Sequence, residues 1–521
     1  MLIFETVILL LLAGALLAML AKRLRAPYPA LLALAGTGGA LLPGLPQVTL
    51  DPELALALFV APTLLDAAYD ASPRDLKANW RPVGGLVVVC VLCTAFAVAW
   101  VARLIEPGLP WAAAIALGAI VAPPDASAAA AVLRQLRPPH RVLVILEGES
   151  LLNDATALLL FRVAVGAAMG GAISGWQVVP MLLLTCGGGA LFGIAAAWVW
   201  VRLSTHREDL AVAVLVQFLG TFAVWLLAER LGLSAIITMV AYAMTIARLV
   251  PSRIDGRERM ASYAVWEVAV FVLNILAFIL IGLQLRGILD RLGGLQWRDV
   301  SFAAAACAVV ILMRFAWVMG YVIVARLGKR TEGSPSIAGG IVISWCGMRG
   351  IVTLAAALAL PEGFPYRDLI LLTAFAVALV TLVLQGLSLR WLLERLGLPD
   401  DGGVEREVAL ARQATARAAL EVLHAAPRGR AAEVLEREYL ARLRPMEGGG
   451  EDLSGLQRQA VAAQRRVLAE LRSHGTIGDD AFHVIEEEID LLDLTADPRI
   501  RDLTAPADRP PTQQSSTRLP I

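Results

Sequence analysis

Runs of apolar residues, each about twenty residues long, recur along most of this chain and restrict what it can fold into. Thirteen such runs are centred near residues 11, 35, 60, 92, 122, 155, 190, 219, 241, 275, 312, 348 and 380. A helix needs about 20 apolar residues to cross the hydrocarbon core of a bilayer. Only 17% of the 521 residues are charged, against about 25% in an ordinary soluble domain. We therefore predict an all-α polytopic membrane protein with thirteen transmembrane helices, surrounded by membrane lipids.

The composition of the sequence changes near residue 398 from mostly apolar to charged, and this change predicts two domains. Residues 1–397 form the transmembrane domain, and residues 398–521 are charged with helical apolar spacing. The last part, about 505–521, has the composition of a disordered segment. We predict a helical cytoplasmic tail that either regulates the membrane domain or only tethers it. Because the net charge of the chain is zero, no nucleic-acid partner is expected.

The lysines and arginines of the connecting loops indicate the orientation. Eighteen of them lie in loops after odd-numbered runs up to the eleventh, and six lie in loops after even-numbered runs. Short loops rich in Lys and Arg stay in the cytoplasm. We therefore expect the N-terminus outside and the C-terminus in the cytoplasm. The loop 286–298 is the one discordant connection.

Two of the runs contain residues that interrupt a helix. The fifth carries Pro123, Pro124 and Asp125 at its middle, and a proline inside a helix costs about 3 kcal/mol. The twelfth carries the sequence GMRG at positions 347–350. Runs one to six and eight to thirteen form two sets of six, the second inverted by the single run between them, and each break falls fifth in its set. Paired breaks in two inverted repeats indicate the central site of a transporter.

The sixth run, LEGESLLNDATALLLF, holds three carboxylates in a segment that is otherwise able to cross a membrane. A charge at the centre of such a helix costs roughly 2.5–3.5 kcal/mol. At about 100° per residue, Glu147, Ser150 and Asp154 share one stripe of the helix. Glu149 and Asn153 lie on the neighbouring stripe. Two polar faces predict two separate roles.

The stripe of Glu149 and Asn153 predicts a structural role. Arg349 lies at the interrupted middle of the twelfth run, and an unpaired buried charge strongly destabilises a protein. We expect Glu149 to pair with Arg349 and Asn153 to add a hydrogen bond. Arg314, in the eleventh run, is expected to pair with an acid or to cap a helix end instead of binding substrate.

The stripe of Asp154 predicts an ion-binding role. Asp154 and Ser150 are expected to face Asp125 across the break in the fifth run. Two carboxylates in a medium of low dielectric constant repel each other, so they favour binding one positive charge, either a proton or a monovalent cation. Glu147, two turns nearer the cytoplasm, fits an ion entry path. Asp66, in the third run, lies either on the ion path or at the cytoplasmic end of its helix.

Competition between a proton and a cation at a site that faces the two sides in turn is sufficient for cation/proton exchange. The sequence contains no G-x-x-x-x-G-K-[ST] loop, so nothing indicates a motor driven by ATP. We predict a secondary antiporter, not an enzyme, which needs no cofactor and transports H+ and Na+, with K+ or Li+ as variants. A gated cation channel and a membrane sensor on the same fold are the alternatives, and the paired carboxylates and breaks favour a carrier.

Several stretches of the chain resemble, in order, those of the bacterial antiporters of cation/proton antiporter family 1. These are the NhaP-like relatives of the eukaryotic sodium/proton exchangers. The matching stretches include FVAPTLLDAAYDASPRDLKANWRP, VAPPDASAAAAVLRQL, ILEGESLLNDATALLLF and WCGMRGIVTLAAALALP. The combination of GESLLNDA with a later GMRG is far more specific than one short motif.

The resemblance implies a thirteen-helix homodimer of the bacterial inner membrane, in which a six-helix core moves like an elevator beside a dimerisation domain. An Asn-Asp pair in the sixth helix implies electroneutral exchange of one cation for one proton. The resemblance assigns ion binding to Asp154, Asp125 and Ser150. It assigns stabilisation of the site to Glu149, Arg349 and Asn153.

Two positions depart from the pattern of the family. Many relatives have Thr before the aspartate of the fifth helix, where this chain has Pro124, so one hydroxyl ligand is absent. The acid of the third helix is often Glu in relatives and is Asp66 here. Because the number and reach of the ligands decide which cation a site selects, the preferred cation stays open.

Overall fold

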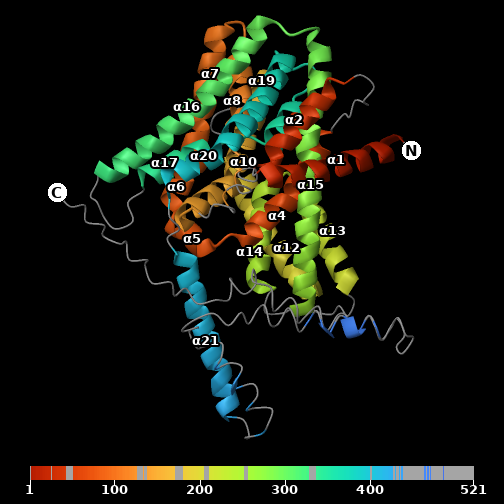
Figure 1. The fold of residues 1–521 in the computed structure, drawn as a ribbon. Helices are drawn as coiled ribbons and strands as arrows, with labels where there is room; N and C mark the ends of the chain where they lie inside the picture. The colour runs from red at the N-terminus through yellow and green to blue at the C-terminus, as the bar shows by residue number, and fades with distance from the viewer. Residues whose placement is uncertain are drawn as a thin grey trace, which may run out of the picture. The chain divides into compact units, whose positions relative to one another are not determined.

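The described part of the chain is almost entirely helical in the computed structural model (Figure 1). It comprises isolated positions and the residue ranges 2–24, 26–42, 51–125, 138–170, 180–204, 210–250, 256–327, 336–398 and 402–425. The chain divides into two compact units, Met1–Asp400 and Asp401–Ile521. In the second unit the main described element is the helix α21 (Gly403–Ala425). Every regular element among the described residues is a helix.

The first half of the membrane unit contains the helices of the first six predicted spans. They are α1 (Leu2–Leu24), α2 (Tyr28–Ala40), α3 (Pro52–Ala55) with η1 (Leu56–Val60) and α4 (Ala61–Asp70), α6 (Trp80–Gly84) with η2 (Gly85–Cys90) and α7 (Val91–Ile105), α8 (Trp111–Val121), and α10 (His140–Ala168). The short helix α5 (Pro73–Ala78) lies between α4 and α6. The elements η1 and η2 are π-helical turns inside longer helices.

The second half contains the helices of the remaining predicted spans. They are η3 (Leu183–Gly187) with α12 (Gly188–Ser204), α13 (Leu210–Arg230), α14 (Ala235–Leu249), α15 (Gly256–Leu292), α16 (Trp297–Leu327), α17 (Ile337–Trp345) with α18 (Ile351–Leu358), and α19 (Arg367–Val380) with η4 (Thr381–Gln385) and α20 (Gly386–Leu396). The break between α17 and α18 falls where the sequence predicts it.

Nine helical stretches among the described residues are long and apolar enough to cross a membrane. The other predicted spans fall on shorter or broken helices, of which α2 has 13 residues, α8 has 11 and α14 has 15. The prediction of an all-helical membrane protein is therefore confirmed at this level. The count of thirteen crossings and the inverted repeat stay predictions.

Local sequence explains where the broken helices begin and end. Ser336 begins α17 as its N-cap, because its hydroxyl oxygen accepts a hydrogen bond from the amide of Gly339 at 2.8 Å. The helix α8 ends at Val121, two residues before Pro123 and Pro124, which cannot donate backbone hydrogen bonds. The long helix α10 starts directly after Pro139. The first interruption therefore follows from residues that a helix tolerates poorly.

The helices of the membrane unit pack in two groups. One group joins α1, α2, α4, α12, α13, α14 and α15, with α2 against α15 and α12 against α14 as its most extensive contacts. The other group joins α7, α8, α10, α16, α17, α18, α19 and α20. Fewer contacts connect the groups, among them those of α15 with α19 and of α10 with α14. The second group contains both broken helices and the acidic helix α10.

Glycine allows α7 and α8 to approach each other closely. A Cβ at Gly118 of α8 would overlap the backbone carbonyl of Ala95 in α7. A Cβ at Gly38 of α2 would instead have no described neighbour within 4 Å. The close approach of α7 and α8 therefore depends on the missing side chain at Gly118, and it fixes the helix that leads into the first break.

This difference predicts opposite effects of one substitution at two helical glycines. Alanine is the better helix former by about 1 kcal/mol, so Gly38→Ala is expected to keep or slightly raise the midpoint of thermal unfolding. Gly118→Ala is expected to lower it, because overpacking of this kind costs about 1–3 kcal/mol. Thermal unfolding of the purified full-length protein in detergent measures both. Equal midpoints for the two variants would contradict the close contact.

Candidate functional site

The two helix breaks meet at one point in the membrane unit. After α8 the chain continues without helical structure through Pro124 to Asp125, and after α17 it does so from Cys346 to Gly350. The backbone amide of Asp125 donates a hydrogen bond to the carbonyl of Met348 at 2.6 Å. The interrupted fifth and twelfth spans therefore cross at their breaks.

Asn153 joins the helix α10 to this crossing. Its amide nitrogen donates to the carbonyl of Pro124 at 2.7 Å, and its side chain is fully buried. Its amide oxygen has no hydrogen-bond partner among the described residues. A buried acceptor without a donor usually marks the place of a water molecule or an ion. Asn153 therefore fixes α10 to the first break and leaves one oxygen ligand available.

Asp154 and Asp125 form the acidic part of the crossing. Both side chains are half-buried, and each residue directly follows one partner of the hydrogen bond between Asn153 and Pro124. The carboxylate of Asp125 occupies the space that a side chain at Gly350 would need, so it lies directly against the second break. The structure thus brings together two of the predicted ion-binding residues.

The other predicted ion-path residues lie on the helices around the crossing. Ser150 is half-buried, one turn before Asp154 on α10. Glu147 is exposed on the same helix, nearer its start. Asp66 is half-buried on α4, which packs against α10. Roles in ion binding for Ser150 and Asp66, and in ion entry for Glu147, stay predictions.

The predicted pairing of Glu149 with Arg349 is wrong, because Glu149 pairs with Arg314 of α16. The guanidinium Nη1 and Nη2 of Arg314 lie 2.5 and 2.8 Å from the Oε1 and Oε2 of Glu149. Each of these residues is 1% exposed. Arg349 is the expected partner because it lies at a helix break. Arg314 instead reaches Glu149 from an unbroken helix, because α16 packs against α17 and α7.

Arg314 also caps the half-helix α17. Its Nε and Nη2 donate to the carbonyl of Ile343 at 3.1 and 2.9 Å. The prediction that Arg314 pairs with an acid or caps a helix end is therefore confirmed in both of its parts. The carbonyls at the C-terminal end of a helix have no intrahelical donor and carry partial negative charge, so a guanidinium is well suited to this position.

Arg349 caps the C-terminal end of α8 at the other break, as Arg314 caps that of α17. Its Nε donates to the carbonyl of Val121 at 3.0 Å, and its Nη2 donates to that of Ala122 at 3.2 Å. It also donates to the carbonyl of Gly347. Each broken span therefore has an arginine at the C-terminal end of its first half-helix. Arg349 and Asn153 both contact the first break, and their role in stabilising the site stays a prediction.

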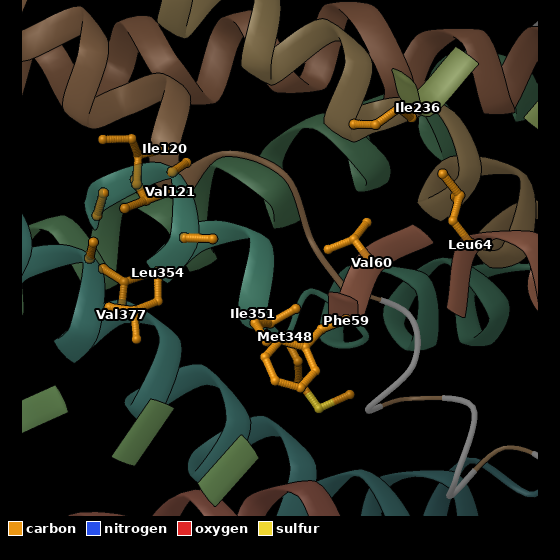
Figure 2. Close-up of a cluster of buried hydrophobic side chains, with 14 of the residues drawn as sticks. Phe59, Val60, Leu64, Ile120, Val121, Ile236, Met348, Ile351, Leu354 and Val377 are labelled. Atoms are coloured by element: carbon orange, nitrogen blue, oxygen red, sulfur yellow. The ribbon is translucent and has the colours of Figure 1, made fainter. Parts of the chain in front are cut away.

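Apolar side chains surround the crossing (Figure 2). Ile120 at the end of α8 and Leu354 of α18 belong to the same buried cluster as Met348 in the second break and Phe59 of η1. Such surroundings strengthen every interaction between charges and leave no bulk water for the unpaired carbonyls. The breaks are stable only because side chains satisfy their backbone groups.

The start of α10 is anchored outside the membrane-spanning segments. The Nε2 of His140 lies 3.4 Å from the Oδ2 of Asp75 in α5, and the Nε of Arg141 donates to the Oδ1 of Asn79 at 3.0 Å. About two turns further along the helix, Gly148 leaves room for the side chain of Leu76. The helix that carries Asp154 is thus fixed at both its start and its middle.

The pKa of Asp75 reflects this anchoring. Burial alone would raise the pKa of this carboxyl, but hydrogen bonds with Ser72, His140 and Arg74 outweigh burial and lower the pKa below its usual value of 3.8. A carboxyl whose pKa is lower in the folded state than in the unfolded state stabilises the fold above the unfolded pKa. This stabilisation is lost as the pH falls through the folded pKa.

Removal of Glu149 is expected to be strongly destabilising. Glu149→Ala leaves the Arg314 guanidinium buried without its carboxylate, which costs about 3–5 kcal/mol. The exposed Glu147 of the same helix is the control, and Glu147→Ala is expected to cost no more than about 1 kcal/mol. Thermal unfolding in detergent measures both. A Glu149→Ala variant as stable as Glu147→Ala would contradict the buried pair.

The anchoring of α10 predicts a specific pH dependence. Asp75→Asn is expected to lower the midpoint of thermal unfolding at pH 7, and its difference from wild type is expected to disappear as the pH falls through the folded pKa of Asp75, which lies below 3.8. Glu362→Gln, at an exposed loop position, is the control and should follow the wild-type curve. Parallel curves for Asp75→Asn and wild type over the whole range would contradict the anchoring.

Comparison with known proteins agrees with this arrangement. The family model described as "Sodium/hydrogen exchanger, transmembrane" matches residues 7–395. An uncharacterized Na+/H+ exchanger of Mycobacterium tuberculosis is 33% identical over 94% of this chain and 97% of its own length. A sodium, potassium, lithium and rubidium/H+ antiporter of Bacillus pumilus is 27% identical over 72% of this chain and 59% of its own length.

The fold is likewise similar to that of a solved structure. The sodium proton antiporter MjNhaP1 from Methanocaldococcus jannaschii aligns with a TM-score of 0.59 and 18% identity, covering 75% of this chain and 98% of that one. At this level of identity the likeness concerns the fold alone. The matched family model covers most of the membrane unit, including both breaks and α10. The chain therefore belongs to the transmembrane sodium/hydrogen exchanger family.

Proposed function

We propose that this protein exchanges a monovalent cation for protons across the bacterial plasma membrane by alternating access. Asp154 and Asp125 bind the cation or the proton in competition, and Ser150 and the free amide oxygen of Asn153 add oxygen ligands. Na+ is the first candidate, with K+ and Li+ as variants. Exchange of this kind serves the control of cytoplasmic pH and sodium.

The observation that carries this proposal is the placement of two carboxylates at the crossing: Asp125 lies against the second break, and Asp154 follows Asn153, which binds the first break. Two carboxylates in apolar surroundings favour the binding of one positive charge. A proton and a hard monovalent cation both meet this need, and the binding of one removes the site for the other. Competition at a single site couples the two ions without any further device.

Both nearby arginines donate hydrogen bonds to other groups. Arg314 is held by both oxygens of Glu149 and by the carbonyl of Ile343. Arg349 is held by three backbone carbonyls at the two breaks.

The formal charges of the crossing favour electroneutral exchange. Arg314 and Glu149 cancel each other as an ion pair. The remaining groups are Arg349, with one positive charge, and two carboxylates, Asp125 and Asp154. One bound cation or one bound proton therefore brings the crossing to zero net charge. This count supports the exchange of one cation for one proton, which the Asn-Asp pair of α10 also implies.

The packing of the helices in two groups supports movement of the site across the membrane. The crossing and α10 lie in the group that contains α7, α8 and α16 to α20. Fewer contacts connect this group with the one built on α2, α14 and α15. A sliding movement between the groups would carry the site from one side of the membrane to the other, as the elevator mechanism requires.

The cation preference of the proposed site includes more than sodium. The Bacillus pumilus relative is described as an antiporter of sodium, potassium, lithium and rubidium. Pro124 supplies a backbone carbonyl but no hydroxyl, and Asn153 already uses that carbonyl. With fewer fixed ligands, a site discriminates less between cations of different radius. We therefore propose transport of K+ and Li+ beside Na+.

The arginines of the discordant loop 286–298 support the proposed orientation. Arg298 pairs with Glu106 at 2.5 Å, and Arg291 pairs with Asp368 at 3.5 Å. Both acids belong to connections that follow even-numbered spans. Arg286 donates to the carbonyl of Leu42, after the second span, at 3.3 Å. Each of these arginines thus contacts a residue on the side of the membrane that is proposed to face outward. This agrees with an N-terminus outside and a C-terminus in the cytoplasm.

The assembly and the tail complete the proposal. The helix α1 exposes large apolar side chains, among them Leu9, Leu12 and Leu16, that need lipid or a second copy of the chain as cover. The resemblance to antiporters of this family favours a homodimer. The cytoplasmic tail, with α21 as its main described helix, is proposed to regulate exchange.

Proton movement in proteoliposomes tests this function. Na+, K+ or Li+ is added to vesicles that contain the full-length protein and a pH-sensitive dye. We expect each active cation to move protons without a membrane potential, and Asp154→Asn to abolish this movement because it removes the charge for which the ions compete. The control, Glu362→Gln, changes an exposed acid and is expected to exchange like wild type. Exchange that persists in folded Asp154→Asn would contradict the proposal, and a current far above carrier rates would indicate a channel.

A further inference from the structure

The last membrane span carries a polar stripe that faces the second helix break. Thr381, Gln385 and Ser388 are spaced four and three residues apart, which places them on one face of a helix. Thr381 and Gln385 are the first and last residues of the π-helical turn η4, and Ser388 follows in α20. Single π-helical turns within α-helices are frequent at functional sites.

The two outer residues of the stripe bind the two ends of the break. The hydroxyl oxygen of Thr381 accepts a hydrogen bond from the backbone amide of Arg349 at 3.0 Å. The hydroxyl oxygen of Ser388 accepts one from the indole Nε1 of Trp345 at 2.9 Å. Because Trp345 and Arg349 flank the non-helical backbone, the middle residue of the stripe, Gln385, is placed opposite the break itself.

Gln385 has no described partner in this position. Its side chain is 0% exposed, and neither its amide oxygen nor its amide nitrogen forms a hydrogen bond with a described residue. The next residue, Gly386, lies close to the Met348 sulfur. Met348 is the residue whose carbonyl accepts from the amide of Asp125. The residue that follows Gln385 therefore lies against a residue of the crossing.

We propose that Gln385 is a further residue of the ion path, whose amide binds a water molecule of the hydration shell of the transported cation beside the break. This inference rests on the proposed function. The amide oxygen is a hard acceptor of the kind that monovalent cations and their water molecules prefer, and the amide nitrogen donates two hydrogen bonds. A buried amide whose oxygen and nitrogen both lack hydrogen-bond partners is unfavourable. A water molecule or an ion bound to the amide would remove this cost.

The alternative is a dry amide that packs as if it were apolar. The two cases respond differently to Gln385→Met, which keeps the length of the side chain and removes both polar groups. A dry, unpartnered amide is a net cost, so its removal should raise the midpoint of thermal unfolding and leave transport unchanged. Loss of a bound water molecule should instead weaken cation binding.

The test compares Gln385→Met with wild type in the proteoliposome assay, with Na+ as the added cation. We expect the apparent KM for Na+ to rise about tenfold, the effect of one lost hydrogen bond of about 1.4 kcal/mol, with little change in kcat. The thermal midpoint without Na+ should stay near that of wild type. Gln296→Met, the same replacement at an exposed loop position, is the control. An unchanged KM together with a raised thermal midpoint would overturn the role of Gln385.

A second variant decides the question if Gln385→Met does not fold. Gln385→Glu keeps an oxygen ligand and adds a titratable group, so it should lower the KM for Na+ or shift the pH profile of exchange. A KM and a pH profile equal to those of wild type would overturn the proposal. Wild-type exchange in the same vesicles is the reference. Exchange that is present but insensitive to residue 385 overturns only the role of Gln385, whereas absence of wild-type exchange overturns the proposed function as well.

Discussion

The crossing of two broken helices in an apolar interior is the constraint on which the rest of the site depends. A break exposes carbonyls that neither the helix nor water can satisfy at this depth. Arg314 donates to the end of α17 and Arg349 to the end of α8. Without these two guanidinium groups the breaks would be too unfavourable to persist. The same groups determine the charge that remains for the transported ions.

Buried charge in this protein is divided between fixed and exchangeable groups. Arg314 and Glu149 form a bidentate ion pair, and neither has another salt bridge with a described residue. Arg349 stabilises backbone at both breaks, and Asn153 ties α10 to the first of them. We propose that a mobile ion neutralises charge on the two remaining carboxylates, Asp125 and Asp154. Of the three carboxylates of α10, Glu149 is thus explained by its ion pair with Arg314.

The sequence alone was sufficient for the breaks and for the acidic centre, because these depend on local chemistry. Two adjacent prolines, Pro123 and Pro124, interrupt a helix in the middle of a span, and the placement of Asn153 and Asp154 on neighbouring stripes follows from helical periodicity. The partner of Glu149 could not be predicted in this way, since it is decided by how α16 packs against α17. Gln385 was missed for a related reason. Gln385 lies in an apolar span, and its place near the break follows only from the hydrogen bonds of Thr381 and Ser388 with Arg349 and Trp345.

The central claim is that a cation and a proton compete for one site, and proton release on cation binding tests it most directly. Na+ is added to the purified protein in weakly buffered detergent solution, and the released protons are counted against the Na+ bound. The account predicts about one proton released for each Na+ in wild type, and neither binding nor release in Asp154→Asn. Binding of Na+ to wild type without proton release would contradict it.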